Sequence, residues 1–396
     1  MPLVPADLRI DARWVLPMTV RDMVLEQHSL LVRDGRILEI LPTRRAAEHY
    51  SASVTLNRPS HLVLPGMVNA DGRGAPEPDG VLRAIAQMLR SGITSFTDRR
   101  SPPEAAARAA QDQGMRILVG MPVAESATQW AQNAAEYLSR ALALRDEYRG
   151  HPLVSTTFAP LDINGLKDAT FSRLATLADE LDAGIMLDVN TCAAQIRESE
   201  VEHGVRPLQR LWNLGLLTPA LNAVHMAAAS TEDIELAQRT GISVSLCPQM
   251  NLYAGWGLPP AAGIIAARIR LGLGSANAQP LGHDVWGDMK LLALMLKATD
   301  CGTTPCSDWD AVAAATHGGA AILGLDSEIG TLEAGKWADL CCVDLGGLTE
   351  ARDPVQAMVY AGSPDIVTDV WVAGRQLLSQ RELTRLDWPT LAASAG

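Results

Sequence analysis

No apolar run in this sequence is long enough to cross a membrane, and residues 1–14 lack the apolar core of a secretory signal peptide. Asp7, Arg9, Asp11 and Arg13 interrupt the short apolar runs of this first segment. We therefore expect a cytoplasmic protein that does not associate with membranes.

Positive charge is scarce, because 33 lysines and arginines stand against 45 aspartates and glutamates and leave a formal net charge of −12. An acidic chain repels phosphate backbones, so nucleic acid is not an expected partner. Cysteine is scarce as well, and none of the 6 cysteines forms a C-x-x-C pair. We expect free thiols in a reducing compartment rather than disulfides or a zinc knuckle. The cysteines are Cys192, Cys247, Cys301, Cys306, Cys341 and Cys342.

Strand-like and helix-like segments alternate through the middle of the chain. The first strand opens the stretch His61–Gly74, where an apolar run at Leu62–Leu64 gives way to polar residues, as in a buried parallel strand that ends in a site. The other strand segments are Gly92–Thr97, Arg116–Gly120, Leu153–Phe158, Gly184–Val189, Leu221–His225, Ser243–Cys247 and Ile269–Gly274. Eight such units predict an α/β fold, a (β/α)8 TIM barrel with its active site at the carboxyl ends of the strands. A doubly wound open sheet is the alternative.

Both ends of the chain carry hairpin patterns. Asp34-Gly35 separates two short strands within residues 29–40, and residues 369–378 again read as strand, turn and strand. We therefore predict that residues 1–60 and 329–396 form one composite domain, a small β-sandwich built from both termini. Residues 61–328 form the barrel inserted between them.

Four stretches together resemble the amidohydrolase superfamily. They are Leu64–Ala70, Ser91–Asp98, His203–Leu217 and Ile329–Leu340, in that order. The closest resemblance is to the branch of triazine chlorohydrolases and of methylthioadenosine and adenosylhomocysteine deaminases. That resemblance implies the barrel fold, a hydrolase acting on C–N bonds, and a catalytic metal bound by histidines and an aspartate.

This chain departs from the family pattern at most of the positions that the resemblance implies for metal binding and catalysis. The implied metal-ligand positions hold Asp71, Arg73, Asp188 and Ala276, and the position of the proton-shuttling glutamate holds Thr191. Leu246 stands where the seventh strand usually carries a histidine, whereas His225 keeps the histidine of the sixth strand. A guanidinium is always cationic and cannot bind a metal ion, and a threonine cannot shuttle a proton near neutral pH.

These departures predict a deaminase relative that is catalytically inactive and acts as a binding or assembly protein, without zinc or another divalent metal. The expected partners are a second copy or an active relative, with a nucleoside-like or heterocyclic small molecule as ligand. Two enzymatic alternatives stay open. One is a C–N hydrolase with a remodelled, metal-free site that uses His225. The other is a metal-dependent hydrolase in which Asp71, Asp188 and His225 converge on the ion.

Arg73 follows Asp71 by two residues, so both side chains can point to the same face of an extended strand end. We predict that the Arg73 guanidinium pairs with Asp71 and Asp188 and balances their charge, as a metal ion otherwise would. The alternative is that Arg73 points outward to solvent. Trp256, between two glycines after the seventh strand, is predicted to border the same pocket.

Overall fold

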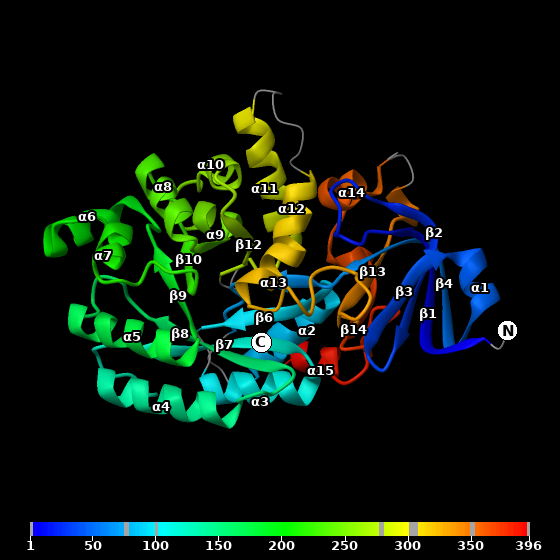
Figure 1. Ribbon diagram of the computed structural model, residues 1–396, viewed down its shortest axis with the longest axis horizontal. Helices are drawn as coiled ribbons and strands as arrows, with labels where there is room; N and C mark the ends of the chain where they lie inside the picture. The colour runs from blue at the N-terminus through cyan, green and yellow to red at the C-terminus, as the bar shows by residue number, and fades with distance from the viewer. Residues whose placement is uncertain are drawn as a thin grey trace.

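The computed structural model describes residues 3–74, 79–99, 102–276, 281–300, 308–348 and 353–393. Two sheets organise the chain (Figure 1). One is a parallel barrel sheet wrapped by helices, and the other is a sheet built from strands of both termini. The predicted fold class, a (β/α)8 barrel with a small β domain from both chain ends, is confirmed.

The barrel sheet runs in sequence order from β5 to β12, and the strands that pair along it are parallel. Backbone hydrogen bonds close the ring, because Ala70 N donates to Leu273 O at 2.7 Å and Ala276 N donates to Asp71 O at 2.7 Å. The strands are β5 (Met67–Asn69), β6 (Ile93–Asp98), β7 (Arg116–Val123), β8 (Val154–Pro160), β9 (Gly184–Val189), β10 (Leu221–His225), β11 (Ser243–Leu246) and β12 (Arg270–Leu273).

Helices follow the barrel strands and cover them from outside (Figure 1). The best-defined start is α8, where the Ser230 side chain and Asp233 form a capping box and Gly241 ends the helix in the left-handed conformation. The helices are α2 (Gly80–Arg90), α3 (Pro103–Gln113), α4 (Ala134–Glu147), α5 (Asp168–Leu181), α6 (Ala193–His203), α7 (Pro207–Asn213), α8 (Thr231–Thr240), α9 (Pro248–Tyr253), α10 (Ala261–Ala266), α11 (Val285–Asp300), α12 (Asp308–Ala313), the π-helix Ala314–Gly318 and α13 (Gly319–Ile322).

The terminal sheet has the order β16-β15-β14-β13-β4-β1-β2-β3, so β4 and β13 join the two ends of the chain. Both predicted hairpins are present, as the pairs β2–β3 and β14–β15. The elements are β1 (Val4–Val15), β2 (Leu25–Arg33), β3 (Arg36–Pro42), α1 (Thr43–His49), β4 (Tyr50–Pro65), β13 (Leu340–Asp344), α14 (Pro354–Gln356), β14 (Val367–Val372), β15 (Arg375–Ser379), β16 (Glu382–Leu383) and α15 (Trp388–Ala393).

One strand assignment from the sequence is wrong. The apolar run Leu62–Leu64 belongs to β4 and pairs antiparallel with β13, and the first barrel strand begins only at Met67. The chain changes sheets at Gly66, where a Cβ atom would lie 2.2 Å from the Thr94 side chain. A buried apolar run looks the same in either sheet, so the sequence could not distinguish them. The division of the chain into domains at residues 60/61 and 328/329 stays a prediction.

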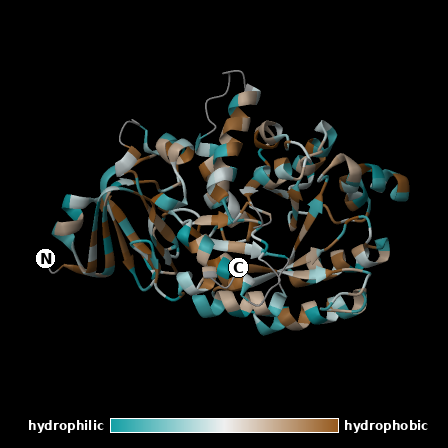
Figure 2. Cartoon of the chain, turned by 180° about the vertical axis from the view of Figure 1, so that it is seen from behind, coloured by the Kyte–Doolittle hydropathy of each residue, from teal (hydrophilic) through white to brown (hydrophobic). Residues whose placement is uncertain are grey.

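The core lies between the barrel strands and the helices around them, and its largest fully buried side chains include Phe96, Phe158 and Phe171. Figure 2 shows hydrophobic residues along the strands of both sheets and more hydrophilic residues on the surrounding helices. Cys192, Cys247, Cys341 and Cys342 are free thiols, whereas Cys301 and Cys306 lie outside the described residues. Within the described ranges, no helix is both long and apolar enough to cross a membrane.

Candidate active site

The polar residues that end the barrel strands meet at the carboxyl end of the barrel. Asp71 and Arg73 follow β5, Arg99 follows β6, Asp188 lies near the end of β9, and His225 ends β10. The backbone at Arg73 and His225 has positive φ angles of 31° and 74°, which non-glycine residues rarely adopt. Such conformations persist where the surrounding structure enforces them, often at functional sites.

Arg73 lies between the two carboxylates. Its Nε donates to Asp71 Oδ2 at 2.8 Å, and its Nη2 donates to both oxygens of Asp188, at 2.8 and 3.0 Å. The Arg73 side chain is buried, with 7% of its surface exposed. The prediction that Arg73 points inward and pairs with both acids is therefore confirmed, and the outward alternative is wrong.

Arg99 is a second buried arginine in the same cluster, and the sequence did not point to it. Its Nε and Nη2 each donate to Asp71 at 3.0 Å, and Nη2 also donates to Asp188 Oδ1 at 2.6 Å. Gly120 on β7 leaves room for this side chain, because a Cβ atom there would lie 2.7 Å from Arg99 Cγ. Its place directly after a barrel strand was the signal that could have identified it.

Two carboxylates and two guanidiniums thus form a neutral cluster, which we call the mouth cluster (Asp71, Arg73, Arg99 and Asp188). Burial alone raises the pKa of Asp71 and of Asp188, but Arg73 and Arg99 outweigh burial and hold both pKa values below the usual range. Both acids are therefore ionised at neutral pH. The Asp188 side chain is still 33% exposed, so solvent reaches the cluster from that side.

His225 is fully buried beside the mouth cluster. Its Nδ1 lies 2.8 Å from Asn251 Oδ1, and its Nε2 lies 3.4 Å from Arg73 Nη2 and 3.9 Å from Asp188 Oδ1. Trp256 packs against the ring edge-on, with 5.1 Å between ring centroids, so the tryptophan does border the site. Burial lowers the pKa of His225 to about 4, although Asp188 acts in the opposite direction. A neutral ring that donates from Nδ1 to Asn251 leaves the Nε2 lone pair facing Arg73 Nη2, which can donate to it.

The remaining predicted site residues also lie at strand ends. Thr191 follows β9, Leu246 ends β11, and Ala276 follows β12 with a φ of 57°. Ala276 is buried in a small apolar cluster with Met186, Val224 and Cys247, and it brings no polar atom of its side chain to the site. The catalytic role predicted for His225 stays a prediction.

Asn69, the last residue of β5, has a structural role in the stretch Leu64–Ala70. Its Nδ2 donates to Ser275 Oγ at 2.8 Å, and its Oδ1 accepts from Ser275 N at 3.0 Å and from Asp71 N at 3.3 Å. These bonds tie the ends of β5 and β12 together and orient the backbone at Asp71. The motif therefore has a positional role here.

Several buried polar atoms near the site have no hydrogen-bond partner within the described part of the chain. They are both amide atoms of Asn190, the Thr191 hydroxyl and Asn251 Nδ2. Buried polar groups are nearly always satisfied, by protein, water or a bound group. This end of the barrel is therefore suited to receive a polar ligand.

The site contains donors for a metal ion. One donor atom from each of Asp71, Asp188 and His225 lies within 4.8 Å of the other two. Two carboxylates and a neutral imidazole fit a divalent ion such as zinc, and Asn251 supplies the partner that orients the imidazole. The donor set fits the metal, although Arg73 and Arg99 already contact both carboxylates.

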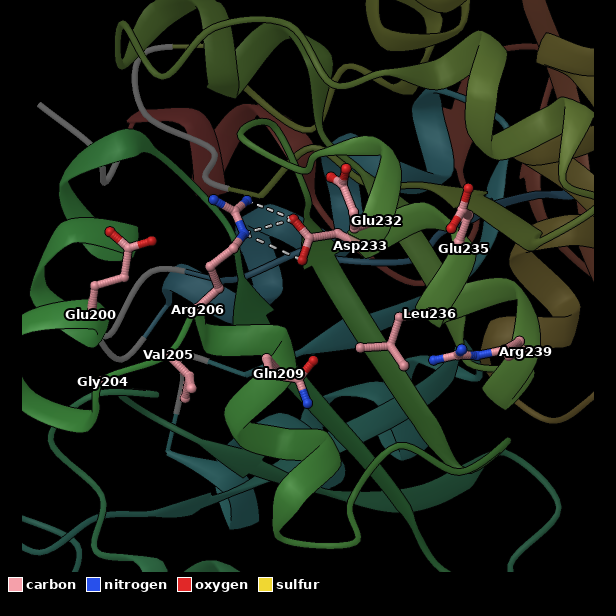
Figure 3. Close-up of a pocket in the computed structure, with 10 residues that line it drawn as sticks. All are labelled: Glu200, Gly204, Val205, Arg206, Gln209, Glu232, Asp233, Glu235, Leu236 and Arg239. Carbon is pink, nitrogen blue, oxygen red and sulfur yellow. Dashed lines mark hydrogen bonds and ion pairs between the residues drawn. The ribbon is translucent and has the colours of Figure 1, made fainter.

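A surface hollow of about 630 Å³ lies apart from the mouth cluster, between the end of α6, α7 and α8 (Figure 3). Arg206 points across it to Asp233, with Nη2 donating to Oδ2 at 2.5 Å and to Ala228 O at 3.0 Å. Asp233 is also the capping-box residue of α8. Arg206, which belongs to the stretch His203–Leu217, thus holds the start of α8 and supports the fold.

A closed parallel barrel with carboxylates and a histidine at the carboxyl ends of its strands has its polar residues where barrel enzymes carry their active sites. The chain belongs to the amidohydrolase family, whose model, described as "Amidohydrolase family", matches residues 75–377. It is 34% identical to a 5-methylthioadenosine/S-adenosylhomocysteine deaminase of Teredinibacter turnerae, covering 98% of this chain and 96% of that protein.

Two solved structures place this fold among known barrels. A crystal structure of an adenosine deaminase from Xanthomonas campestris with bound zinc has a TM-score of 0.96 and 34% identity, covering 100% of this chain and 98% of that one. An atrazine chlorohydrolase from Arthrobacter aurescens TC1, complexed with zinc, has a TM-score of 0.84 and 21% identity, with 98% of each chain covered. At that identity, the second likeness shows the fold alone.

The expectation that zinc or another divalent metal is absent is wrong. The 34% identical adenosine deaminase was crystallised with zinc, and the donor cluster of Asp71, Asp188 and His225 points to a metal-dependent amidohydrolase. The expectation gave more weight to the cationic Arg73 at a ligand position than to the alternative in which Asp71, Asp188 and His225 converge, and the structure shows that convergence.

Proposed function

We propose that this protein is a hydrolase of non-peptide C–N bonds, of the deaminase type, acting on a purine nucleoside or a similar heterocycle in a remodelled site. Relatives at 34% and 32% identity over almost the whole chain are named 5-methylthioadenosine/S-adenosylhomocysteine deaminases, which supports this class of substrate. The single observation that carries the proposal is the convergence of Asp71, Asp188 and His225 at the carboxyl end of the barrel.

Asp71, Asp188 and His225 would hold the divalent ion. When bound, such an ion supplies a water molecule of lowered pKa, which is the nucleophile that hydrolysis of an amidine-like carbon requires. The reaction replaces the amino group with oxygen from water and releases ammonia.

The chain's own residues contribute orientation and charge. Asn251 fixes the His225 ring, and Trp256 packs against its edge, which limits the access of water from that side. Because Nδ1 donates to Asn251, the Nε2 lone pair of neutral His225 is the one that would bind the ion. Thr191, whose hydroxyl has no partner among the described residues, can bind a polar substrate group but cannot shuttle a proton.

A second candidate is a protein that binds a nucleoside-like ligand without turning it over. The observation that favours it is the pairing of both carboxylates with Arg73 and Arg99, together with threonine at the position of the shuttle acid. Assembly as a homodimer or with an active relative, and a cytoplasmic location, stay proposals. Analytical ultracentrifugation of the purified chain tests the first of them.

The test measures ammonia release from adenosine, 5-methylthioadenosine and S-adenosylhomocysteine, with and without added zinc. We expect release that His225→Ala and Asp71→Asn each abolish, and that Glu235→Gln, in the surface hollow, leaves unchanged. Absence of ammonia with every substrate, with or without zinc, contradicts the enzymatic proposal. A substrate-induced rise in melting temperature under those conditions supports the binding protein instead.

A further inference from the structure

We propose that Arg73 is a built-in competitor of the divalent cation: its guanidinium occupies the space between the three candidate ligands, so metal binding requires this side chain to leave. The inference rests on the proposed function only in taking Asp71, Asp188 and His225 as the metal-binding set. It concerns the affinity for the ion and can be tested without any substrate.

The position of Arg73 supports this assignment directly. Its Nε lies 2.8 Å from Asp71 Oδ2, and its Nη2 lies 2.8 Å from Asp188 Oδ1 and 3.4 Å from His225 Nε2. One planar cation therefore contacts a donor atom of each candidate ligand. An ion bound by all three would occupy the space that this guanidinium fills, and it would lie in contact with a like charge.

Arg99 provides an internal contrast. It carries the same charge and contacts the same two acids, at 3.0 Å to Asp71 and 2.6 Å to Asp188. Among the described residues, the hydrogen bonds and ion pairs of Arg99 reach neither nitrogen of His225. Arg99 thus flanks the acids, whereas Arg73 lies among all three ligands.

Charge balance leads to the same conclusion. Asp71 and Asp188 already have two guanidiniums for their two negative charges, so an added divalent ion would leave two uncompensated positive charges in a buried site. Loss of either arginine removes one of these charges. Only loss of Arg73 also empties the space between the ligands.

The experiment compares Arg73→Ala with Arg99→Ala, two variants that make the same change in charge. Zinc and cobalt(II) affinities are measured by titration calorimetry, and bound metal per chain is counted by elemental analysis. We expect Arg73→Ala to bind at least about 100-fold more tightly than the native chain, and Arg99→Ala to gain no more than about tenfold. Cobalt(II) bound among two carboxylates and an imidazole also gives a visible spectrum.

Native-like affinity in Arg73→Ala overturns the proposal, and so does an equal gain in both variants, because charge alone would then explain the effect. His225→Ala added to Arg73→Ala should reverse the gain, which identifies the ligand set. If Arg73→Ala folds only with zinc, seen as circular dichroism that appears on adding the metal, and Arg99→Ala does not respond to zinc in this way, the proposal is supported; the same zinc requirement in both variants overturns it. If they do not fold at all, Arg73→Gln and Arg99→Gln take their place under the same criteria.

Discussion

Arg73 and Arg116 are both buried arginines paired with aspartates, yet their surroundings differ. Arg116, at the start of β7, donates from Nε to Asp339 Oδ2 at 2.5 Å and from Nη2 to Oδ1 at 3.1 Å. Its Nη1 reaches Pro152 O at 2.6 Å, and Asp339 Oδ1 accepts from Ala373 N at 2.7 Å. Both side chains are almost completely covered, with 3% and 1% exposed. This pair joins the barrel to the terminal sheet.

The mouth cluster also consists of arginine–aspartate pairs, but solvent reaches it. Asp188 is 33% exposed, and the neighbouring polar atoms of Asn190 and Thr191 have no partner within the described residues. A saturated pair such as Arg116–Asp339 fixes two parts of the fold. A cluster that solvent reaches, beside a histidine lone pair and unsatisfied polar atoms, has remaining capacity for a ligand. The exposure and the unsatisfied polar neighbours of an arginine–aspartate pair therefore indicate a binding site better than the number of its ion pairs does.

The largest effect is expected for Arg116→Ala. This substitution leaves the Asp339 carboxylate buried without its cation, at a cost of about 4 kcal/mol in the free energy of unfolding. Urea unfolding followed by circular dichroism measures it. A loss below about 1 kcal/mol would mean that the contact between barrel and terminal sheet does not depend on this pair.

A smaller loss, about 3 kcal/mol, is expected for Arg73→Ala in metal-free buffer, because Arg99 still pairs with both acids and Asp188 is partly exposed. Added zinc should restore part of the lost stability in this variant and none in Arg116→Ala. Chemical unfolding with and without zinc makes the comparison. Zinc rescue of both variants would show that the two arginines are equivalent.

The free energy of unfolding should depend on pH through His225, which lies beside the mouth cluster, and not through the Arg116–Asp339 pair. Burial lowers the pKa of His225 to about 4, below its ordinary value of 6.5, so the unfolded chain binds the extra proton first as pH falls. The contribution of neutral His225 to the free energy of unfolding is complete above pH 6.5. It is lost as the pH falls from 6.5 to 4, by roughly 3 kcal/mol at most. The substitution His225→Gln should reduce the change in the free energy of unfolding between pH 6.5 and 4. His283, whose pKa burial also lowers to about 4, should supply another part of that change. An unchanged pH dependence in His225→Gln would contradict the assignment.

The smallest effect is expected at an exposed pair. Arg21 contacts both oxygens of Asp310, at 3.0 and 3.1 Å, but its side chain is 45% exposed. Arg21→Ala should change the free energy of unfolding by no more than about 0.5 kcal/mol. A loss comparable with that of Arg116→Ala would show that burial does not govern these pairs.

The sequence by itself determined the local elements. Seven barrel strands and the two terminal hairpins follow from apolar runs and turn residues, which act over a few residues. It also predicted that Arg73 and Asp71 face the same site, although both residues follow the end of β5 and Arg73 has a positive φ, so the strand geometry behind that prediction does not apply. The strand and hairpin predictions need only the geometry of a short segment.

Only the tertiary structure decided which distant residues meet. It moved Leu62–Leu64 into the terminal sheet, brought Arg99 to Asp71 and Asp188, and placed Asn251 and Trp256 against His225. These contacts join strand ends that lie far apart in the chain and become neighbours because the barrel closes. The convergence of Asp71, Asp188 and His225 arises in the same way, so the sequence could offer it only as an alternative and the tertiary structure decided it.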